Sequence, residues 1–283
     1  MSKPKLKTQW APFPHEYSSC SSLKPEDFEW SRNEGIANVW IDNQIMKHVG
    51  TPENNFGWFC ESSEVLPGLK DFLSRNLSVV RRRFKKIYTC DHDLISLDPS
   101  FFIFNPPGSN LPWTPRENYR IPDKTKICSM ISSSKDMTTG HKLRLRVARE
   151  IKNMVDLFGG AHGSTRIGSG IGPNGDWWRS KEEALTPYMF SVVFENIKID
   201  KYYTEKITDC FALGVIPIYW GTDKISEDFN SEGIIRWSEG FDFNTLTKEL
   251  YDSKIEFIKD NLERVKKLKS SDDLLFNQIK NNV

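Results

Sequence analysis

Short apolar segments and amphipathic segments alternate along the second half of the chain. The apolar segments have the length of strands, and the amphipathic ones carry apolar residues at helical spacing. The predicted strands cover residues 127–133, 155–158, 188–194, 215–220 and 234–237, and the predicted helices cover residues 140–154 and 204–213. Strands that alternate with helices form a parallel sheet with helices on its faces, so this half is predicted to be an α/β unit.

The pattern changes after residue 240. Apolar side chains recur at helical spacing, with Lys and Glu between them, at Tyr251, Ile255, Ile258, Leu262 and Val265. This spacing predicts a long amphipathic helix whose apolar face packs on the rest of its domain.

The first half of the chain is less regular. Its predicted elements are a short helix at residues 68–75 and strands at residues 36–41, 57–60, 83–88 and 101–105, which form a second, partly irregular α/β unit. Five of the 15 prolines fall between Asn105 and Asp123. Proline fixes φ and removes a backbone donor, so this stretch is predicted to be a linker or an extended rim loop. We place the domain boundary at its end, which gives domains of residues 1–123 and 124–283.

Composition excludes several classes of protein. The 39 Lys and Arg balance the 38 Asp and Glu, which leaves no excess charge for binding nucleic acid. The longest apolar run, Phe211–Trp220, is about half as long as a bilayer requires, and the N-terminus has no apolar signal region. The five cysteines are widely spaced without a CxxC pair, which indicates neither disulfides nor zinc. A soluble cytoplasmic protein is expected.

Two motifs have competing interpretations. Residues 170–175 match GxGxxG, but neither a strand before them nor a helix after them is evident, so a surface loop is expected rather than a dinucleotide site. Five basic residues between 81 and 86 could contact phosphate. Because the total charge is near zero, we expect a solvated end of a helix or strand instead.

The segment from Phe194 to Lys206 favours an anion site. A strand runs into a polar turn, and Thr204 is a good N-cap for a helix whose first turn carries Glu205 and Lys206. In parallel sheets ligands bind beyond the carboxyl ends of strands, where helix N-termini offer free N–H groups. A nucleotide diphosphate would fit there, although an ordinary strand–turn–helix connection has the same pattern.

The same segment resembles a known family. Residues 194–221, FENIKIDKYYTEKITDCFALGVIPIYWG, are similar to the signature of the α1,3-fucosyltransferases, glycosyltransferase family 10. Shorter similarities follow in the family's order, at residues 58–62, 88–93, 124–133, 144–146 and 155–159. The resemblance is strong over residues 124–238 and patchy over residues 57–98. Animal members carry a membrane anchor and disulfides, so this chain looks like a soluble bacterial or viral member.

The resemblance implies a fold and a reaction. Family members adopt the GT-B fold, in which two Rossmann-like domains face each other across a cleft and the C-terminal domain holds the sugar nucleotide. They are inverting enzymes that transfer L-fucose from GDP-fucose to a glycan hydroxyl, commonly in α1,3 linkage to N-acetylglucosamine or glucose. The same fold and reaction are expected here, with residues 1–123 on the acceptor side.

The resemblance also implies a catalytic base. Inversion needs a group that removes the proton of the acceptor hydroxyl, and Glu61 matches the family's proposed base. Apolar neighbours such as Trp58 and Phe59 would favour the protonated form of such a carboxyl group. Glu64 is the alternative base.

On the donor side, Arg144 and Lys206 would bind the diphosphate, Arg144 through its fork of donors and Lys206 as a point charge. Glu205 would accept hydrogen bonds from the ribose hydroxyls, and Asn196 and Tyr202 would contact phosphate or fucose. Two further candidates are Arg146, which could instead lie on a helix surface, and Glu195.

Cofactor and partner expectations follow. No DxD pair lies near the donor residues, so no metal site and no obligatory metal are expected, and a divalent cation would at most stimulate. The expected partners are a nucleotide-sugar donor and a glycan acceptor. Two alternatives remain open: a GT-B transferase with a different nucleotide-sugar donor, and a catalytically decayed module that binds nucleotide or glycan.

Overall fold

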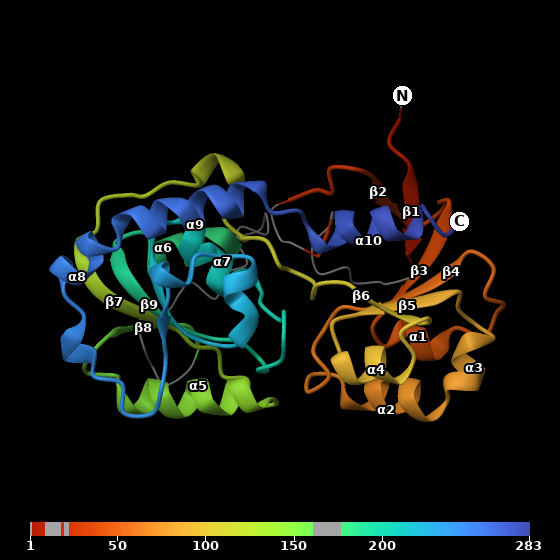
Figure 1. Cartoon of the computed structure of the whole chain (residues 1–283), viewed down its shortest axis with the longest axis horizontal. Helices are drawn as coiled ribbons and strands as arrows, with labels where there is room; N and C mark the ends of the chain where they lie inside the picture. The colour runs from red at the N-terminus through yellow and green to blue at the C-terminus, as the bar shows by residue number, and fades with distance from the viewer. Residues whose placement is uncertain (1, 9–17, 20–22, 161–176) are drawn as a thin grey trace. The chain divides into compact units, whose positions relative to one another are not determined.

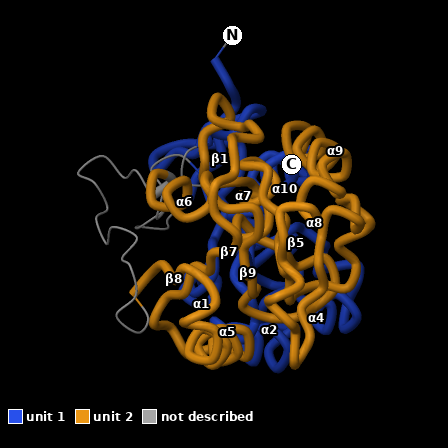
Figure 2. Tube along the Cα trace, turned by 90° about the vertical axis from the view of Figure 1, so that its left-hand side faces the viewer, with its two compact units in different colours: residues 1–110, 269–283 blue, residues 111–268 orange. Residues whose placement is uncertain are grey.

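The computed structural model describes residues 2–8, 18–19, 23–160 and 177–283. The chain divides into two compact units, which Figure 2 colours separately: residues 1–110 with 269–283, and residues 111–268. Each unit is built around one parallel sheet (Figure 1). The prediction of an α/β protein with two doubly wound units is therefore confirmed.

The N-terminal unit has a six-stranded sheet. Its strands, in spatial order, are β2 (Glu29–Ser31), β1 (Lys5–Thr8), β3 (Ala37–Ile41), β4 (Asn55–Phe59), β5 (Lys86–Thr89) and β6 (Phe102–Phe104). Its helices are α1 (Gln44–Lys47), α2 (Pro67–Arg75), α3 (Leu77–Arg81), α4 (His92–Leu97) and α10 (Ser271–Ile279). Helices α1 to α4 pack on one face of the sheet, and α10 packs on the other.

Helix α10 was expected to belong to the C-terminal domain, and the structure corrects this. Leu275, Phe276 and Ile279 are buried in the core of the N-terminal unit. The first turn of α10 adds polar contacts, since Asp272 accepts a hydrogen bond of 2.8 Å from Trp30 Nε1 and Asp273 accepts one of 2.9 Å from the backbone N–H of Asp27. Apolar burial and these hydrogen bonds together assign residues 269–283 to the N-terminal unit.

The unit boundary lies between residues 110 and 111, rather than at the predicted 123. The proline-rich stretch after it packs on the C-terminal unit instead of spanning open solvent. The backbone N–H groups of Trp113 and Thr114 donate to the buried Asp209 carboxylate at 2.8 and 3.2 Å, and Arg120 N–H donates to the carbonyl of Ala212 at 3.0 Å. The prolines mark an extended path along that unit.

The C-terminal unit has a five-stranded sheet. Its strands, in spatial order, are β8 (Asp156–Phe158), β7 (Lys126–Ile131), β9 (Tyr188–Phe194), β10 (Ile216–Trp220) and β11 (Ile235–Arg236). Its helices are α5 (Thr139–Glu150), α6 (Trp177–Leu185), α7 (Glu205–Ala212), α8 (Lys248–Ser253) and α9 (Ile255–Lys267). Numbered along the chain, the strand order is 2-1-3-4-5, the flavodoxin-like form of a doubly wound sheet.

Alternate residues of the central strands fill two cores. Val193 and Tyr219 face α6, α7 and α9, whereas Val192 and Ile218 face α5 and α8. The predicted long helix is two helices, because the backbone at Lys254 leaves the helical conformation with ψ 7° between α8 and α9. Short 3₁₀ turns cover Arg116–Asn118, Asp223–Glu227, Ser231–Gly233 and Phe243–Thr245.

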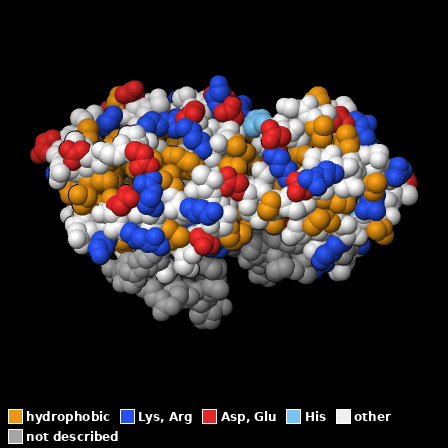
Figure 3. Space-filling view, turned by 90° about the horizontal axis from the view of Figure 1, so that it is seen from below, with side chains coloured by type: hydrophobic (Ala, Val, Ile, Leu, Met, Phe, Trp, Pro, Cys, Tyr) orange, Lys and Arg blue, Asp and Glu red, His pale blue; other side chains and the backbone are white. Residues whose placement is uncertain are grey.

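The surface agrees with the balanced composition. Basic, acidic and apolar side chains are interspersed on the face that Figure 3 shows. The basic cluster begins at the end of α3, where Arg81 Nε donates to Asp98 at 2.9 Å.

The GxGxxG motif at 170–175 lies outside the described residues. Within the described ranges no helix is long and apolar enough to cross a bilayer, and Cys60, Cys90, Cys128 and Cys210 are buried thiols.

Candidate active site

The strand order of the C-terminal unit defines where a ligand would bind. Strands β7 and β9 are neighbours, and the strands that follow them in the chain, β8 and β10, lie on opposite sides of this pair. The connections after β7 and β9 therefore leave in opposite directions. A crevice forms outside the carboxyl ends of the strands at such a point. Helix α5 follows β7 and helix α7 follows β9, so the N-termini of both helices lie at this edge.

The first turn of α5 lies directly against the end of β9. Gly140 N–H donates to the carbonyl oxygen of Asn196 at 3.0 Å. A Cβ atom on Gly140 would lie 1.8 Å from the carbonyl oxygen of Glu195. Only glycine allows this approach, which brings the side chains of α5 to the turn after β9.

Gly140→Ala is therefore expected to destabilise the C-terminal unit by about 2 kcal/mol or more, because the new methyl group must displace backbone. Gly68→Ala is a matched control, since Gly68 is also the second residue of its helix and a Cβ there meets nothing within 4 Å. We expect the control to lie within about 1 kcal/mol of the wild type. Chemical denaturation measures both, and equal midpoints for the two variants would show that the contact is unimportant.

Glu195 organises the turn before α7. Its side chain is fully buried, and the backbone N–H and hydroxyl of Thr204 donate to its two oxygens at 2.9 and 2.8 Å. Burial raises the pKa of Glu195, while the Lys206 ammonium, 3.7 Å from Oε2, opposes this rise. Thr204 occupies the predicted N-cap position, but its hydroxyl serves Glu195 and does not cap the helix.

Glu205 is buried between two lysines. Its Oε1 lies 3.4 Å from Lys206 Nζ and 3.5 Å from Lys181 Nζ. Burial alone would raise the pKa of Glu205, but the two ammonium groups outweigh it and lower the pKa to about 2. Glu205 is thus a carboxylate at neutral pH and retains the capacity to accept further hydrogen bonds.

Arg144 is a buried cation with little compensation. Its side chain lies in α5, and the whole residue is 6% exposed. Nη2 donates to the hydroxyl of Ser133 at 2.8 Å, while the buried Nε has no hydrogen-bond partner among the described residues. Burial lowers the pKa of Arg144, and the more distant charges of Glu205 and Glu195 oppose this. A desolvated guanidinium with free donor capacity is suited to an anionic ligand.

His141, which the sequence did not single out, belongs to the same cluster. Its backbone N–H is capped by Thr138 Oγ1 at 3.1 Å, and its buried Nδ1 has no partner among the described residues. Burial, followed by the charges of Arg144 and Lys206, lowers the pKa of His141 to about 4. The imidazole is therefore neutral at pH 7. The N-cap at Thr138 is a sequence signal that places His141 in the first turn of α5. The residues that surround His141 could not be predicted, because they depend on how α5 packs against α7.

The remaining donor candidates divide into two groups. Asn196 lies in the turn after β9 with a buried, unpartnered Oδ1, and Tyr202 is buried in the same connection. Arg146 points instead to the outer surface of α5, where it pairs with Glu150 at 3.2 Å and with Glu239. The interpretation of Arg146 as a helix-surface residue is the one that fits.

Glu61 lies in the N-terminal unit, two residues after β4. Its side chain is exposed, and its backbone N–H donates to Asp42 Oδ1 at 3.3 Å. Trp58 and Phe59 are buried on opposite faces of the sheet, so they do not enclose the Glu61 carboxylate as expected. Glu64 follows in the turn before α2 and is partly buried.

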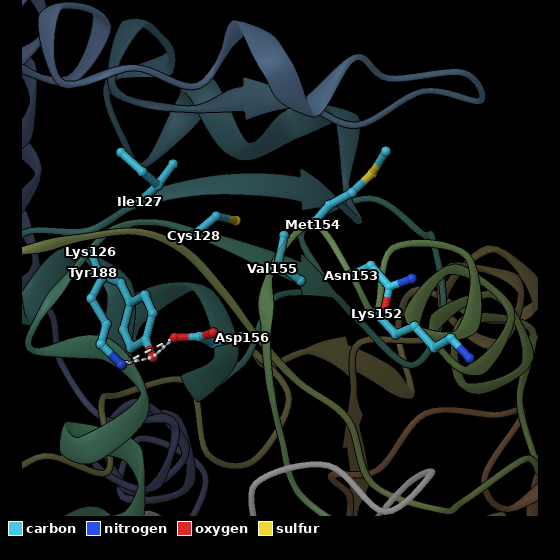
Figure 4. Close-up of a pocket in the computed structure, with 9 residues that line it drawn as sticks. All are labelled: Lys126, Ile127, Cys128, Lys152, Asn153, Met154, Val155, Asp156 and Tyr188. Atoms are coloured by element: carbon cyan, nitrogen blue, oxygen red, sulfur yellow. Dashed lines mark hydrogen bonds and ion pairs between the residues drawn. The ribbon is translucent and has the colours of Figure 1, made fainter.

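A cavity of about 370 Å³ lies at the opposite end of the strands of the C-terminal sheet, where β7, β8 and β9 begin (Figure 4). Three of its polar side chains bind one another: Asp156 Oδ2 accepts from Tyr188 Oη at 2.6 Å and lies 3.1 Å from Lys126 Nζ. This cavity lies at the amino ends of the strands, away from the carboxyl ends near which Arg144 and Lys206 lie.

The strand order defines the C-terminal unit as a doubly wound α/β domain, with cationic side chains at the point where the strand order reverses. Residues 121–252 match the model of the glycosyltransferase family 10 (fucosyltransferase) C-terminal domain. This match covers the part of the chain over which the sequence resemblance is strong, and it confirms that resemblance.

Individual proteins are more distant. An α-(1,3)-fucosyltransferase, FucT of Helicobacter pylori, is 36% identical over 81 residues, which are 29% of this chain and 15% of that relative. The chain thus aligns with a small part of that relative's length. A crystal structure of an α1,3-fucosyltransferase covers 93% of this chain and 81% of its own, with 14% identity and a TM-score of 0.49. One of an α1,3-fucosyltransferase with GDP-fucose has 15% identity, the same coverage and a TM-score of 0.37.

Proposed function

We propose that the protein is an inverting glycosyltransferase that transfers L-fucose from GDP-fucose to a hydroxyl of an acceptor glycan, in an α1,3-type linkage. The observation that carries this proposal is the buried Arg144, whose Nε has no partner among the described residues, at the reversal point of a unit that matches the family 10 model. It needs an anion, and a nucleoside diphosphate supplies one.

The donor diphosphate is placed against three groups of the C-terminal unit. Arg144 donates through its fork, Lys206 contributes a full charge beside the free N–H groups that begin α7, and neutral His141 donates one hydrogen bond. Charge on the leaving GDP grows as the glycosidic bond breaks, so these donors stabilise the transition state more than the ground state. Glu205 accepts from the ribose hydroxyls, and Asn196 and Tyr202 complete the site.

The acceptor is activated from the N-terminal unit. The Glu61 carboxylate removes the proton of the acceptor hydroxyl, whose oxygen attacks the anomeric carbon while GDP leaves from the opposite face. One bond forms and one breaks at that carbon, so its configuration inverts. The exposed position of Glu61 at the carboxyl edge of its sheet supports access to an acceptor.

No obligatory metal is proposed, because guanidinium, ammonium and helix N–H groups are available to offset the diphosphate charge. The experiment is an assay of GDP release and glycan transfer on an array, with GDP-fucose, GDP-mannose and UDP-sugars, each with and without EDTA. Transfer from GDP-fucose that survives EDTA is expected. Transfer from another donor would establish the first alternative, GDP binding without any transfer would establish a decayed binding module, and activity lost in EDTA would contradict the metal proposal.

A further inference from the structure

A second carboxyl group lies beside Glu61. Asp42 follows β3 at the carboxyl edge of the N-terminal sheet and is 5% exposed. Its Oδ1 accepts hydrogen bonds from the backbone N–H groups of Cys60 at 2.9 Å and Glu61 at 3.3 Å, and its Oδ2 accepts one from Cys60 Sγ at 3.2 Å. One buried side chain thus holds the backbone that presents Glu61.

The backbone of Asp42 is itself held in a costly conformation. Its φ is 49°, in the left-handed region, which is unfavourable for a residue other than glycine. Asp42 N–H donates to the carbonyl of Trp58 at 2.9 Å, and its own carbonyl accepts from Ile45 N–H at 2.9 Å. Strand β4 and helix α1 therefore fix the turn. The strained backbone at Asp42 places its carboxyl group against the backbone of Glu61.

The surroundings of the carboxyl group make its charge state sensitive to pH. Burial raises the pKa of Asp42 to about 7, and the charge of Glu61 adds to this rise, while Cys60 Sγ and the two N–H groups oppose it. The other titratable groups nearby are the buried thiol of Cys90 after β5, on which Asp91, Glu61 and Asp42 act, and Asp272 of α10, which acts on Cys60. Glu61 is the charged residue that acts directly on Asp42.

We propose that Asp42 is a positioning residue for the catalytic base: it fixes the turn that carries Glu61, and it holds this turn most firmly when its own carboxyl group is ionised. This inference rests on the proposed function, in which Glu61 removes the acceptor proton. A carboxylate accepts hydrogen bonds from N–H groups more strongly than a neutral group does, so the hydrogen bonds from the Cys60 and Glu61 N–H groups strengthen when Asp42 loses its proton.

The test is the pH profile of kcat/KM for transfer from GDP-fucose, measured for the wild type and Asp42→Asn. Asparagine tolerates the left-handed conformation and keeps an oxygen for both N–H groups, so it removes the charge alone. The kcat/KM of the wild type is expected to rise with pH in a step near pH 7, and that of the variant is expected to lack this step. The variant should be about tenfold slower at pH 8 and within about twofold of the wild type at pH 5.5.

Cys60→Ser is the second variant. A hydroxyl donates a stronger hydrogen bond than a thiol to the Asp42 carboxylate, so the step should move to lower pH by roughly half a unit. This variant keeps the inference testable if Asp42→Asn fails to fold. Asp98→Asn is the control. Asp98 is a buried carboxylate of the same unit, but it binds the Arg81 guanidinium rather than the backbone that carries Glu61. It should lower the melting temperature and leave the step in place.

The outcomes distinguish a failure of the inference about Asp42 from a failure of the proposed function. If the wild type transfers fucose and folded Asp42→Asn keeps the same step, or the step does not move in Cys60→Ser, the role of Asp42 is only structural and the inference is wrong. If the wild type transfers no fucose from GDP-fucose under any of these conditions, the proposed function itself is wrong. Thermal unfolding and GDP affinity, measured on every variant, report folding independently of transfer.

Discussion

Arg144→Met is expected to abolish transfer, by about 10³-fold or more, without destabilising the protein. Among the described residues the buried guanidinium has one hydrogen-bond partner, the neutral Ser133, so the folded protein bears the cost of desolvating a charge and recovers little of it. Methionine fills a similar volume with no charge to desolvate. Transfer is lost because the leaving diphosphate would no longer meet its fork of donors.

Thermal unfolding with and without GDP, together with transfer rates, measures this effect. The melting temperature without GDP should equal or exceed that of the wild type, and the increase caused by GDP should disappear. Arg146→Met is a matched control two residues along the same helix, where an exposed guanidinium pairs with Glu150 and Glu239. Its loss should change rate and stability little. A strongly destabilised Arg144→Met that still responds to GDP would mean that Arg144 is a structural residue.

Glu61→Gln is expected to lower kcat by about 10² to 10⁴-fold, because glutamine has no basic oxygen to take the acceptor proton. GDP affinity should not change, since the proposed diphosphate ligands all belong to the C-terminal unit. Stability should not change either, because the Glu61 side chain is exposed.

Single-turnover transfer and GDP titration by calorimetry distinguish these effects. Glu64→Gln is the control, because Glu64 lies three residues further along the same connection. It should transfer at nearly the wild-type rate. If Glu64→Gln loses transfer while Glu61→Gln retains it, the base is Glu64.

Elements with strong local signals were predicted well. Strand β9 has the predicted bounds because seven consecutive buried residues, Tyr188–Phe194, leave no ambiguity, and α7 follows its predicted N-cap. The positions of Glu205 and Lys206 follow from the same logic, since both lie just beyond the carboxyl end of a parallel strand. Arg144 lies further along, within α5, and only the family resemblance pointed to it.

Features made by tertiary contact were not predicted. The Pro-rich stretch was predicted to be a linker or an extended rim loop, and the sequence did not show what holds it: Asp209 binds the backbone N–H groups of Trp113 and Thr114. Helix α10 has a capping signal, in which Ser270 Oγ accepts from Asp273 N–H, but nothing local indicates which sheet it covers. The burial of His141 and Asp42 likewise depends on neighbours that are distant in sequence.

The return of α10 to the N-terminal unit has a consequence for synthesis. Residues 111–268 form a contiguous unit that is complete before α10 leaves the ribosome, whereas the sheet that starts at β1 keeps the apolar face around Val39 and Trp58 uncovered until then. Domains usually mature from the N-terminus during translation. In this chain the order is reversed: the unit that begins first is finished last, and premature termination after residue 268 would leave that face bare and prone to aggregate.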